Sequence, residues 1–138
     1  MEAAHDLWRV FKSVDDQSKH VQARYGVTGP QLGALWELRE RRGLTVTQTA
    51  RRMHVHPSTV TGIADRLEAK ELVRRVRDAK DRRVVHLEIT RKGLALVKRA
   101  PRPSRRRILD GLGEMPEQRL RSFGRVLADI ADMMEEDE

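Results

Sequence analysis

The sequence predicts a mainly helical protein that carries one small β-hairpin, an α+β arrangement. Three observations support this fold class. Apolar residues recur at helical spacing along most of the 138 residues. The period changes to alternation only between residues 73 and 89. The hydrophobic fraction of 38% is modest, but its periodic placement argues against a disordered chain.

The N-terminal part of the chain predicts two helices. Residues 3–24 place Leu7, Phe11 and Val14 on one stripe, and Gly26 can end this helix in a left-handed conformation. A Thr-x-x-Gln capping box at Thr28 then opens a second helix that ends near residue 43.

Two short helices separated by a tight break are expected next. A second Thr-x-x-Gln box at Thr45 opens a helix that runs to about Met53. Pro57 is favourable as the first residue of the following helix, which ends near Lys70. Its apolar stripe consists of Val60, Ile63, Ala64 and Leu67.

A β-hairpin follows the helix pair. Residues 73–77 and 84–89 are rich in β-branched residues and alternate, and the polar segment 78–81 joins them as a turn. Two short helices followed by such a hairpin predict a winged helix-turn-helix with a basic tip on its wing.

The C-terminal part predicts two further helices. Thr90 caps a helix from residue 91 to about 100, Pro101 and Pro103 interrupt it, and a last helix runs from residue 116 to about 134. Its 3-4-3-4 apolar spacing is typical of a helix that packs on another helix. We therefore expect a homodimer whose interface contains Leu7, Phe11, Leu120, Phe123, Leu127 and Ile130.

These elements predict three regions. Residues 1–29 form an N-terminal dimerisation helix, residues 30–100 form the winged helix-turn-helix domain, and residues 101–138 form a linker and a C-terminal dimerisation helix.

Charge is distributed unevenly along the chain. The whole chain carries +7, with +5 in residues 51–83, +8 in residues 91–109 and −6 in residues 110–138. This pattern favours a polyanion partner, or else a solvated basic face balanced by an acidic tail. The basic tract 98–107 is interpreted as a solvated linker, with pairing to the acidic residues 135–138 as the alternative.

The helix that begins at Pro57 and the hairpin tip are the candidate DNA-binding elements. Small hydroxyl side chains opposite the apolar stripe can enter a major groove, and arginines at the tip can enter a minor groove. Arg51 and Arg52 are either phosphate contacts or surface residues. The residues expected at double-stranded DNA are Ser58, Thr59, Thr61, Arg66, Arg77, Lys80, Asp81, Arg82 and Arg83.

At these positions the chain resembles the MarR family of bacterial regulators. The resemblance rests on Leu44-Thr45-x-x-Gln48, Ser58-Thr59-Val60-Thr61, Asp65-Arg66-Leu67-Glu68, Leu72-Val73-Arg74-Arg75, Asp81-Arg82-Arg83 and Ile89-Thr90-x-x-Gly93. It implies that the protein is a dimer that binds a palindromic operator, and that a small aromatic or phenolic ligand releases the dimer from DNA. It also implies that Arg83 enters a minor groove steadied by Asp81, and that the hydroxyls after Pro57 read bases.

The chain departs from the family pattern at three places. Gly62 stands where family members often have arginine, His56 stands where a Ser or Asp cap is usual, and two prolines follow Ala100. We therefore expect base contacts at Gly62 to be absent or to move to Arg66, and His56 to cap its helix less well.

The aromatic residues have two readings. Trp8, Phe11, Tyr25 and Trp36 are core or interface residues, or they line a pocket for an aromatic effector. The five histidines lack metal-ligand spacing and the chain has no cysteine, so neither a metal nor a cofactor is expected.

The sequence thus predicts a transcriptional repressor and no enzyme, because no catalytic constellation is evident. We expect it in the cytoplasm and off the membrane, since the first 20 residues are charged and no apolar run reaches bilayer length. The alternative is a winged-helix ligand-binding or protein-interaction module without DNA binding.

Overall fold

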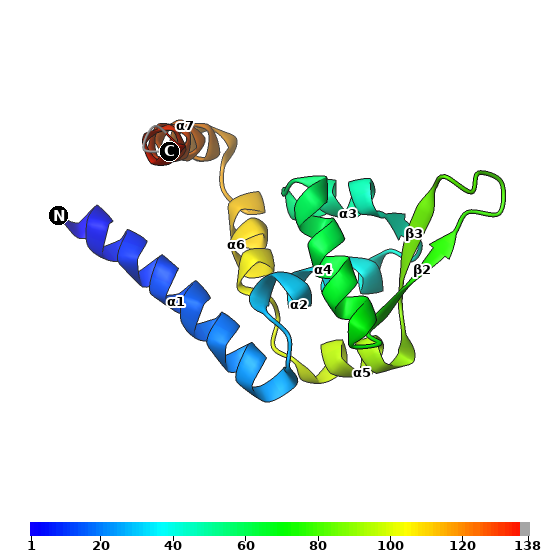
Figure 1. Ribbon diagram of the computed structural model, residues 1–138. Coiled ribbons are helices and arrows are strands. Elements are labelled where there is room, and N and C mark those ends of the chain that lie inside the picture. Colours follow the sequence, from blue (N-terminus) through cyan, green and yellow to red (C-terminus); the bar gives the residue numbers. More distant parts are fainter. Residues whose placement is uncertain (136–138) are drawn as a thin grey trace. The chain divides into compact units, whose positions relative to one another are not determined.

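The computed structural model describes residues 1–135, and these divide into two compact units, residues 1–105 and residues 106–135 (Figure 1). The predicted winged helix-turn-helix lies in the first unit. No helix among residues 1–135 combines the length and the hydropathy needed to cross a membrane.

The first two helices begin and end as their local sequence predicts. Helix α1 spans Glu2–Tyr25 and ends at Gly26, whose φ of +72° is left-handed. Helix α2 spans Gly29–Glu40. At its start, the Thr28 hydroxyl accepts from the backbone N–H of Gln31 (3.3 Å), and the Gln31 side chain accepts from the N–H of Thr28 (3.2 Å). The predicted capping box is confirmed.

The helix-turn-helix consists of α3, Val46–Met53, and α4, Pro57–Ala69. The capping box at Thr45 is also present. His56 fills the cap position of α4, and its Nδ1 accepts from the backbone N–H of Ser58 at 3.2 Å. A ring nitrogen of His56 therefore accepts the capping hydrogen bond that a Ser or Asp oxygen usually accepts.

A three-stranded antiparallel sheet completes the domain, in the order β1-β3-β2. Strand β2 spans Val73–Arg77 and β3 spans Val85–Ile89, close to the predicted hairpin. Strand β1, Leu44–Thr45, was not predicted, because two residues are too short to show alternation. It pairs Leu44 with Leu87. Figure 1 shows the β2–β3 hairpin projecting beyond the helices of its unit as a wing.

The core of the first unit joins α2, α3 and α4 to the base of the sheet. A charged pair also links two of these helices: Glu37 of α2 is buried and accepts from Arg52 Nε of α3 at 2.6 Å. The largest fully buried side chains include Leu32, Leu35, Leu38, Val60, Leu67, Val73 and Leu87.

Helix α5, Arg91–Arg99, packs closely on the start of the wing. Thr90 caps it, accepting from the N–H of Gly93 at 3.1 Å. A Cβ added at Gly93 would lie 2.3 Å from the carbonyl oxygen of Leu72 and 2.7 Å from a side-chain carbon of Ile89. Only glycine allows this approach.

After the two prolines the chain forms α6, Ser104–Gly113, and then α7, Glu117–Glu135. The last helix was predicted, but α6 lies where the sequence suggested a linker. The side chain of Gln17 accepts from the N–H of Ser104 at 2.6 Å, so α1 supplies an acceptor for the first turn of α6. Such a long-range cap is invisible in the local sequence.

Replacing Gly93 with alanine should destabilise the protein by about 2–3 kcal/mol, because neither the Leu72 backbone nor the Ile89 side chain can move without disturbing the core. Chemical denaturation measures the free energy of unfolding. The control is Gly62→Ala in α4, where the nearest atom to an added Cβ is 3.8 Å away and where we expect a gain of about 0.5–1 kcal/mol. Equal stability of the Gly93 variant and the native protein would contradict the tight packing.

Candidate nucleic-acid interface

Helix α4 exposes the hydroxyl side chains that were singled out in the sequence. Ser58, Thr59 and Thr61 are exposed, whereas Val60 and Ile63 on the opposite face are buried. The Thr61 hydroxyl donates to the carbonyl of Pro57 at 3.2 Å, and Ser58 Oγ lies 2.8 Å from the His56 ring. The exposed face of the first turns is therefore small and polar, as a helix that enters a major groove requires.

Arg66 lies one turn further along the same helix. It is exposed, and its guanidinium group lies 3.8 Å from the position that a Cβ of residue 62 would take. The Arg66 side chain thus extends along the helix toward Gly62. Its guanidinium group places a positive charge beside residue 62, which has no side chain of its own.

The turn of the wing is ordered by Asp78. Its Oδ2 accepts from the backbone N–H groups of Lys80 (3.0 Å) and Asp81 (2.9 Å). The pKa of Asp78 lies below its ordinary value. The largest cause is the hydrogen bond from the Asp81 N–H, followed by a hydrogen bond with the His86 side chain and by the bond from the Lys80 N–H. Arg77 donates to the carbonyl of Arg82 at 2.8 Å across the same turn. Arg77 therefore braces the wing in addition to carrying exposed charge.

At the tip, the Asp81 carboxylate holds the Arg83 guanidinium group. Asp81 Oδ1 lies 3.2 Å from Arg83 Nε, and Oδ2 lies 3.3 Å from a terminal nitrogen of the same side chain. The side-chain hydrogen bond lowers the pKa of Asp81, and a backbone bond from the N–H of Arg83 adds to the effect. The Arg83 side chain nevertheless remains 92% exposed. It is an oriented cation that is free to meet an anion.

The two remaining tip cations, Lys80 and Arg82, are exposed. Of the two arginines on α3, Arg51 is exposed, but Arg52 pairs with Glu37 and Glu40 of α2. Arg52 thus has a structural partner, whereas Arg51 keeps its charge at the surface.

Arg75 links the wing to helix α4, a role that the sequence analysis did not assign. Its guanidinium group lies 2.5 Å from Asp65 and 2.9 Å from Glu68, both on α4. These three residues belong to two of the motifs that carry the family resemblance, Asp65-Arg66-Leu67-Glu68 and Leu72-Val73-Arg74-Arg75. The motifs contain the paired residues, but the sequence does not show that they pair.

His86 was also missed as part of the site. Its Nδ1 lies 2.6 Å from the carbonyl oxygen of Gly43, and its Nε2 lies 3.1 Å from Asp78 Oδ1. Both oxygens only accept, so the imidazolium form alone donates at both ends. The Gly43 hydrogen bond and then the Asp78 contact raise the pKa of His86 above 6.5. The charged form of His86 can therefore tie the wing turn to the loop before β1 by donating at both ends.

The aromatic and interface candidates are distributed over several elements. Trp8 and Phe11 are exposed on α1, whereas Tyr25 is half-buried and its hydroxyl donates to the carbonyl of Arg99 at 2.9 Å. Trp36 is half-buried against the core, with Arg39 over its ring at 5.2 Å. Leu7 and Ile130 are half-buried in their own units, and the exposed interface candidates of α7 are Leu120, Phe123 and Leu127.

Within residues 1–135, no three His, Asp or Glu side chains gather as a metal-ligand group.

We expect the His86 bridge to weaken as the pH rises. A raised pKa means that its stabilising contribution is fully present below about 6.5 and is lost as the pH rises through the folded-state pKa. Other charged groups near the ring are Asp78 and Glu88. In an NMR titration, the His86 pKa should lie above 6.5 in the native protein and should fall in Asp78→Asn, which keeps an amide oxygen for the turn. Equal values in the two proteins would show that Asp78 does not hold the imidazolium.

Comparison with known proteins agrees with this geometry. The profile of the MarR family matches residues 27–85. The chain is 40% identical over 87 residues to the HTH-type transcriptional repressor MdtR of Bacillus subtilis (strain 168), a match that covers 63% of this chain and 56% of MdtR. The chain thus spans little more than half the length of that relative.

Two solved structures resemble nearly the whole chain. The YusO protein from Bacillus subtilis is 30% identical with a TM-score of 0.61, over 95% of this chain and 93% of that one. A MarR family protein from Bacillus stearothermophilus is 27% identical with a TM-score of 0.60, over 97% and 94%. The winged fold and the family resemblance are confirmed, and the chain belongs to the MarR family, whose members are transcriptional regulators and not enzymes.

Proposed function

We propose that this protein is a sequence-specific transcriptional repressor that binds a palindromic operator as a homodimer. The observation that carries the proposal is the Asp81–Arg83 fork on an ordered wing, with Arg83 almost fully exposed. Each subunit lays the first turns of α4 in a major groove, and its wing reaches the flanking minor groove.

The electrostatics support this docking. Residues 51–83, which contain the end of α3, all of α4 and the wing turn, carry a net charge of +5. Such a surface attracts the phosphate backbone and makes binding dependent on salt. The relative MdtR is named a transcriptional repressor, which supports the same sign of regulation here. We expect the protein to act in the bacterial cytoplasm, where its operator would lie.

The exposed apolar side chains support a dimer. Trp8 is 65% exposed and Phe11 57% exposed on α1, and none of the residues of α7 is buried in the single chain. In proteins most of the stability of a helix comes from the packing of its apolar face, and in the single chain the 19-residue helix α7 buries none of its residues. We infer that a second copy covers these faces. Two half-sites would then lie about one helical turn apart, ~34–36 Å centre to centre.

An aromatic or phenolic effector is the remaining part of the proposal. Trp8, Phe11, Tyr25 and Trp36 are its candidate contacts, and the indole N–H of Trp36 is buried without a hydrogen-bond partner among the described residues. The effector would act by binding more tightly to the dimer arrangement that does not fit the operator, since only differential affinity shifts the equilibrium.

Three wing variants test DNA binding. Arg83→Ala should weaken operator binding by about 1–3 kcal/mol, because it removes the minor-groove cation. Asp81→Ala should also weaken binding, although it removes a negative charge near DNA, because Arg83 loses its orienting partner. Arg82→Ala should weaken all duplexes alike and reduce the salt slope by about one. Fluorescence anisotropy at two salt concentrations measures all three.

The matched control is Glu71→Gln, which also removes one exposed negative charge from the domain but has no contact with Arg83. Long-range electrostatics alone predicts that Glu71→Gln and Asp81→Ala both tighten binding. If Asp81→Ala tightens binding, the fork does not serve DNA recognition. If the native protein binds no duplex in a salt-dependent way, the alternative module without DNA binding is favoured.

Two changes test the dimer. Deleting residues 116–138 should abolish dimers, and Phe123→Lys should shift the equilibrium to monomers by placing a charge on the apolar face of α7. The control Gln118→Lys adds the same charge on the opposite face of that helix and should leave the dimer intact. Sedimentation velocity measures the oligomeric state. A truncated protein that remains dimeric would show that α7 is not the interface.

A further inference from the structure

A surface pocket of about 440 Å³ lies at the base of the wing, where β3 continues into α5. None of the residues proposed for DNA, dimer or aromatic-effector contacts lines it. Its volume falls in the range of about 300–1,000 Å³ that is usual for small-molecule sites. Its lining combines cationic, aliphatic and hydroxyl side chains.

Three arginines from three separate elements line this pocket. Arg42 comes from the loop after α2, Arg74 from β2 and Arg91 from the first turn of α5. Glu88 is the one acidic side chain among the lining residues, and its Oε2 already accepts from Arg74 Nε (3.3 Å) and a terminal nitrogen (3.0 Å). Within residues 1–135, the guanidinium groups of Arg42 and Arg91 have neither an ion pair nor a hydrogen bond. The lining of the pocket therefore carries a net charge of +2, and the guanidinium groups of Arg42 and Arg91 are available to bind an anion.

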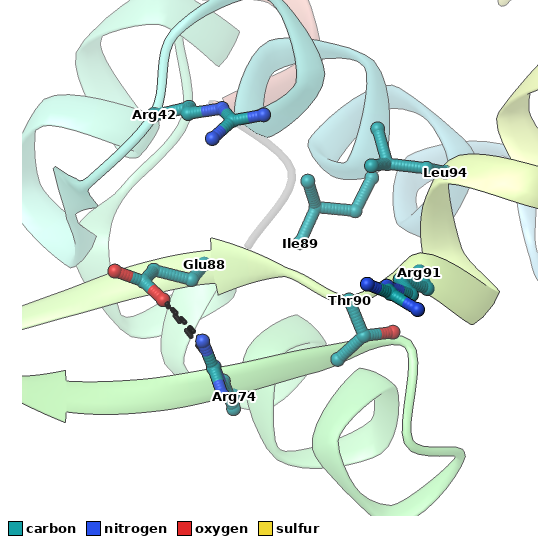
Figure 2. A pocket seen from close by; sticks show the side chains of 7 residues that line it. All are labelled: Arg42, Arg74, Glu88, Ile89, Thr90, Arg91 and Leu94. Carbon is teal, nitrogen blue, oxygen red and sulfur yellow. Dashed lines mark hydrogen bonds and ion pairs between the residues drawn. The ribbon is translucent and has the colours of Figure 1, made fainter.

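An aliphatic surface separates these two cations. Figure 2 shows Ile89 between Arg42 on one side and Arg91 on the other, with Leu94 on the same side as Arg91. Leu94 is 36% exposed and Ile89 is half-buried. The pocket thus offers both a charged rim and an apolar surface that water covers in the free protein.

The backbone around the pocket is held in place. Arg74 and Glu88 are direct partners in the antiparallel register of β2 and β3. The N–H of Thr90 donates to the carbonyl of Leu72 at 3.0 Å, and its hydroxyl donates to the carbonyl of Glu71 at 2.7 Å. A ligand would meet walls that are already ordered, which lowers the entropic cost of binding.

We propose that this pocket binds a small aliphatic carboxylic acid. The carboxylate pairs with the planar guanidinium group of one of the two arginines, Arg42 or Arg91, and the alkyl chain covers Ile89 and Leu94. Inorganic phosphate would satisfy the arginines but leave both aliphatic side chains exposed to water. A neutral alcohol would cover them but leave the charges unengaged.

The test uses the full-length protein, labelled with ¹⁵N, and sodium hexanoate as the probe, without DNA. Hexanoate should shift the amide signals of Ile89, Arg91 and Leu94 in a saturable way, whereas hexanol and inorganic phosphate should bind at least about tenfold more weakly. Because DNA is absent, the result is independent of the proposed operator binding.

Variants identify the contacts. The double variant Arg42→Gln, Arg91→Gln should lower hexanoate affinity by about tenfold or more. The matched control Arg41→Gln removes a neighbouring exposed arginine that does not line the pocket, and it should leave affinity unchanged. Leu94→Ala should weaken hexanoate but not acetate.

Three results would overturn the proposal. The first is the absence of saturable hexanoate shifts at the pocket. The second is phosphate binding that is as tight as hexanoate binding, and the third is a loss of hexanoate affinity in Arg41→Gln as large as that in the double variant. The last two would indicate general attraction of anions to a basic surface.

Discussion

The guanidinium group of Arg75 lies between strand β2 and helix α4 and pairs with Asp65 and Glu68 of that helix. The proposed DNA-reading surface has two parts, the exposed turns of α4 and the tip of the wing, and this ion-pair cluster joins them. Arg75 is 27% exposed, but its partners Asp65 and Glu68 are 63% and 44% exposed, so solvent and salt partly screen both pairs. An arginine that is not proposed to touch DNA therefore helps, together with the shared apolar core, to set the separation between the helix and the wing.

The same domain contains two other long-range connections of this kind. Arg52 joins α3 to the buried Glu37 of α2, and His86 joins the wing turn to the carbonyl of Gly43. In each case a cationic side chain crosses from one element to an acceptor on another. The helix-turn-helix and its wing are thus positioned by directional polar contacts in addition to their shared apolar core.

Local rules predicted most of the fold. Both Thr-x-x-Gln boxes, Pro57 at the start of α4 and the alternation of the hairpin each act within a few residues, so they are visible in the sequence. Helix α6 was not predicted, because its first turn depends on Gln17, 87 residues away. Strand β1 exists only because Leu44 finds Leu87 in the folded sheet.

The candidate site divides in the same way. The Asp81–Arg83 contact spans two residues, and the motif resemblance pointed to it. The roles of Arg75 and His86 depend on which residues the folded chain brings opposite them, so composition and spacing could not show these roles. The charge of the wing was evident from the sequence, whereas the contacts that orient this charge were not.

The wing turn is built without glycine: Asp78 accepts two backbone N–H groups, and Arg77 caps the carbonyl of Arg82. A loop held by its own side chains loses less conformational entropy when it binds than a loose one does. Ala79 is exposed at the turn and takes no part in these hydrogen bonds. Substitution at that position can alter the tip while the framework persists, so the surface of the wing can change here without a loss of folding.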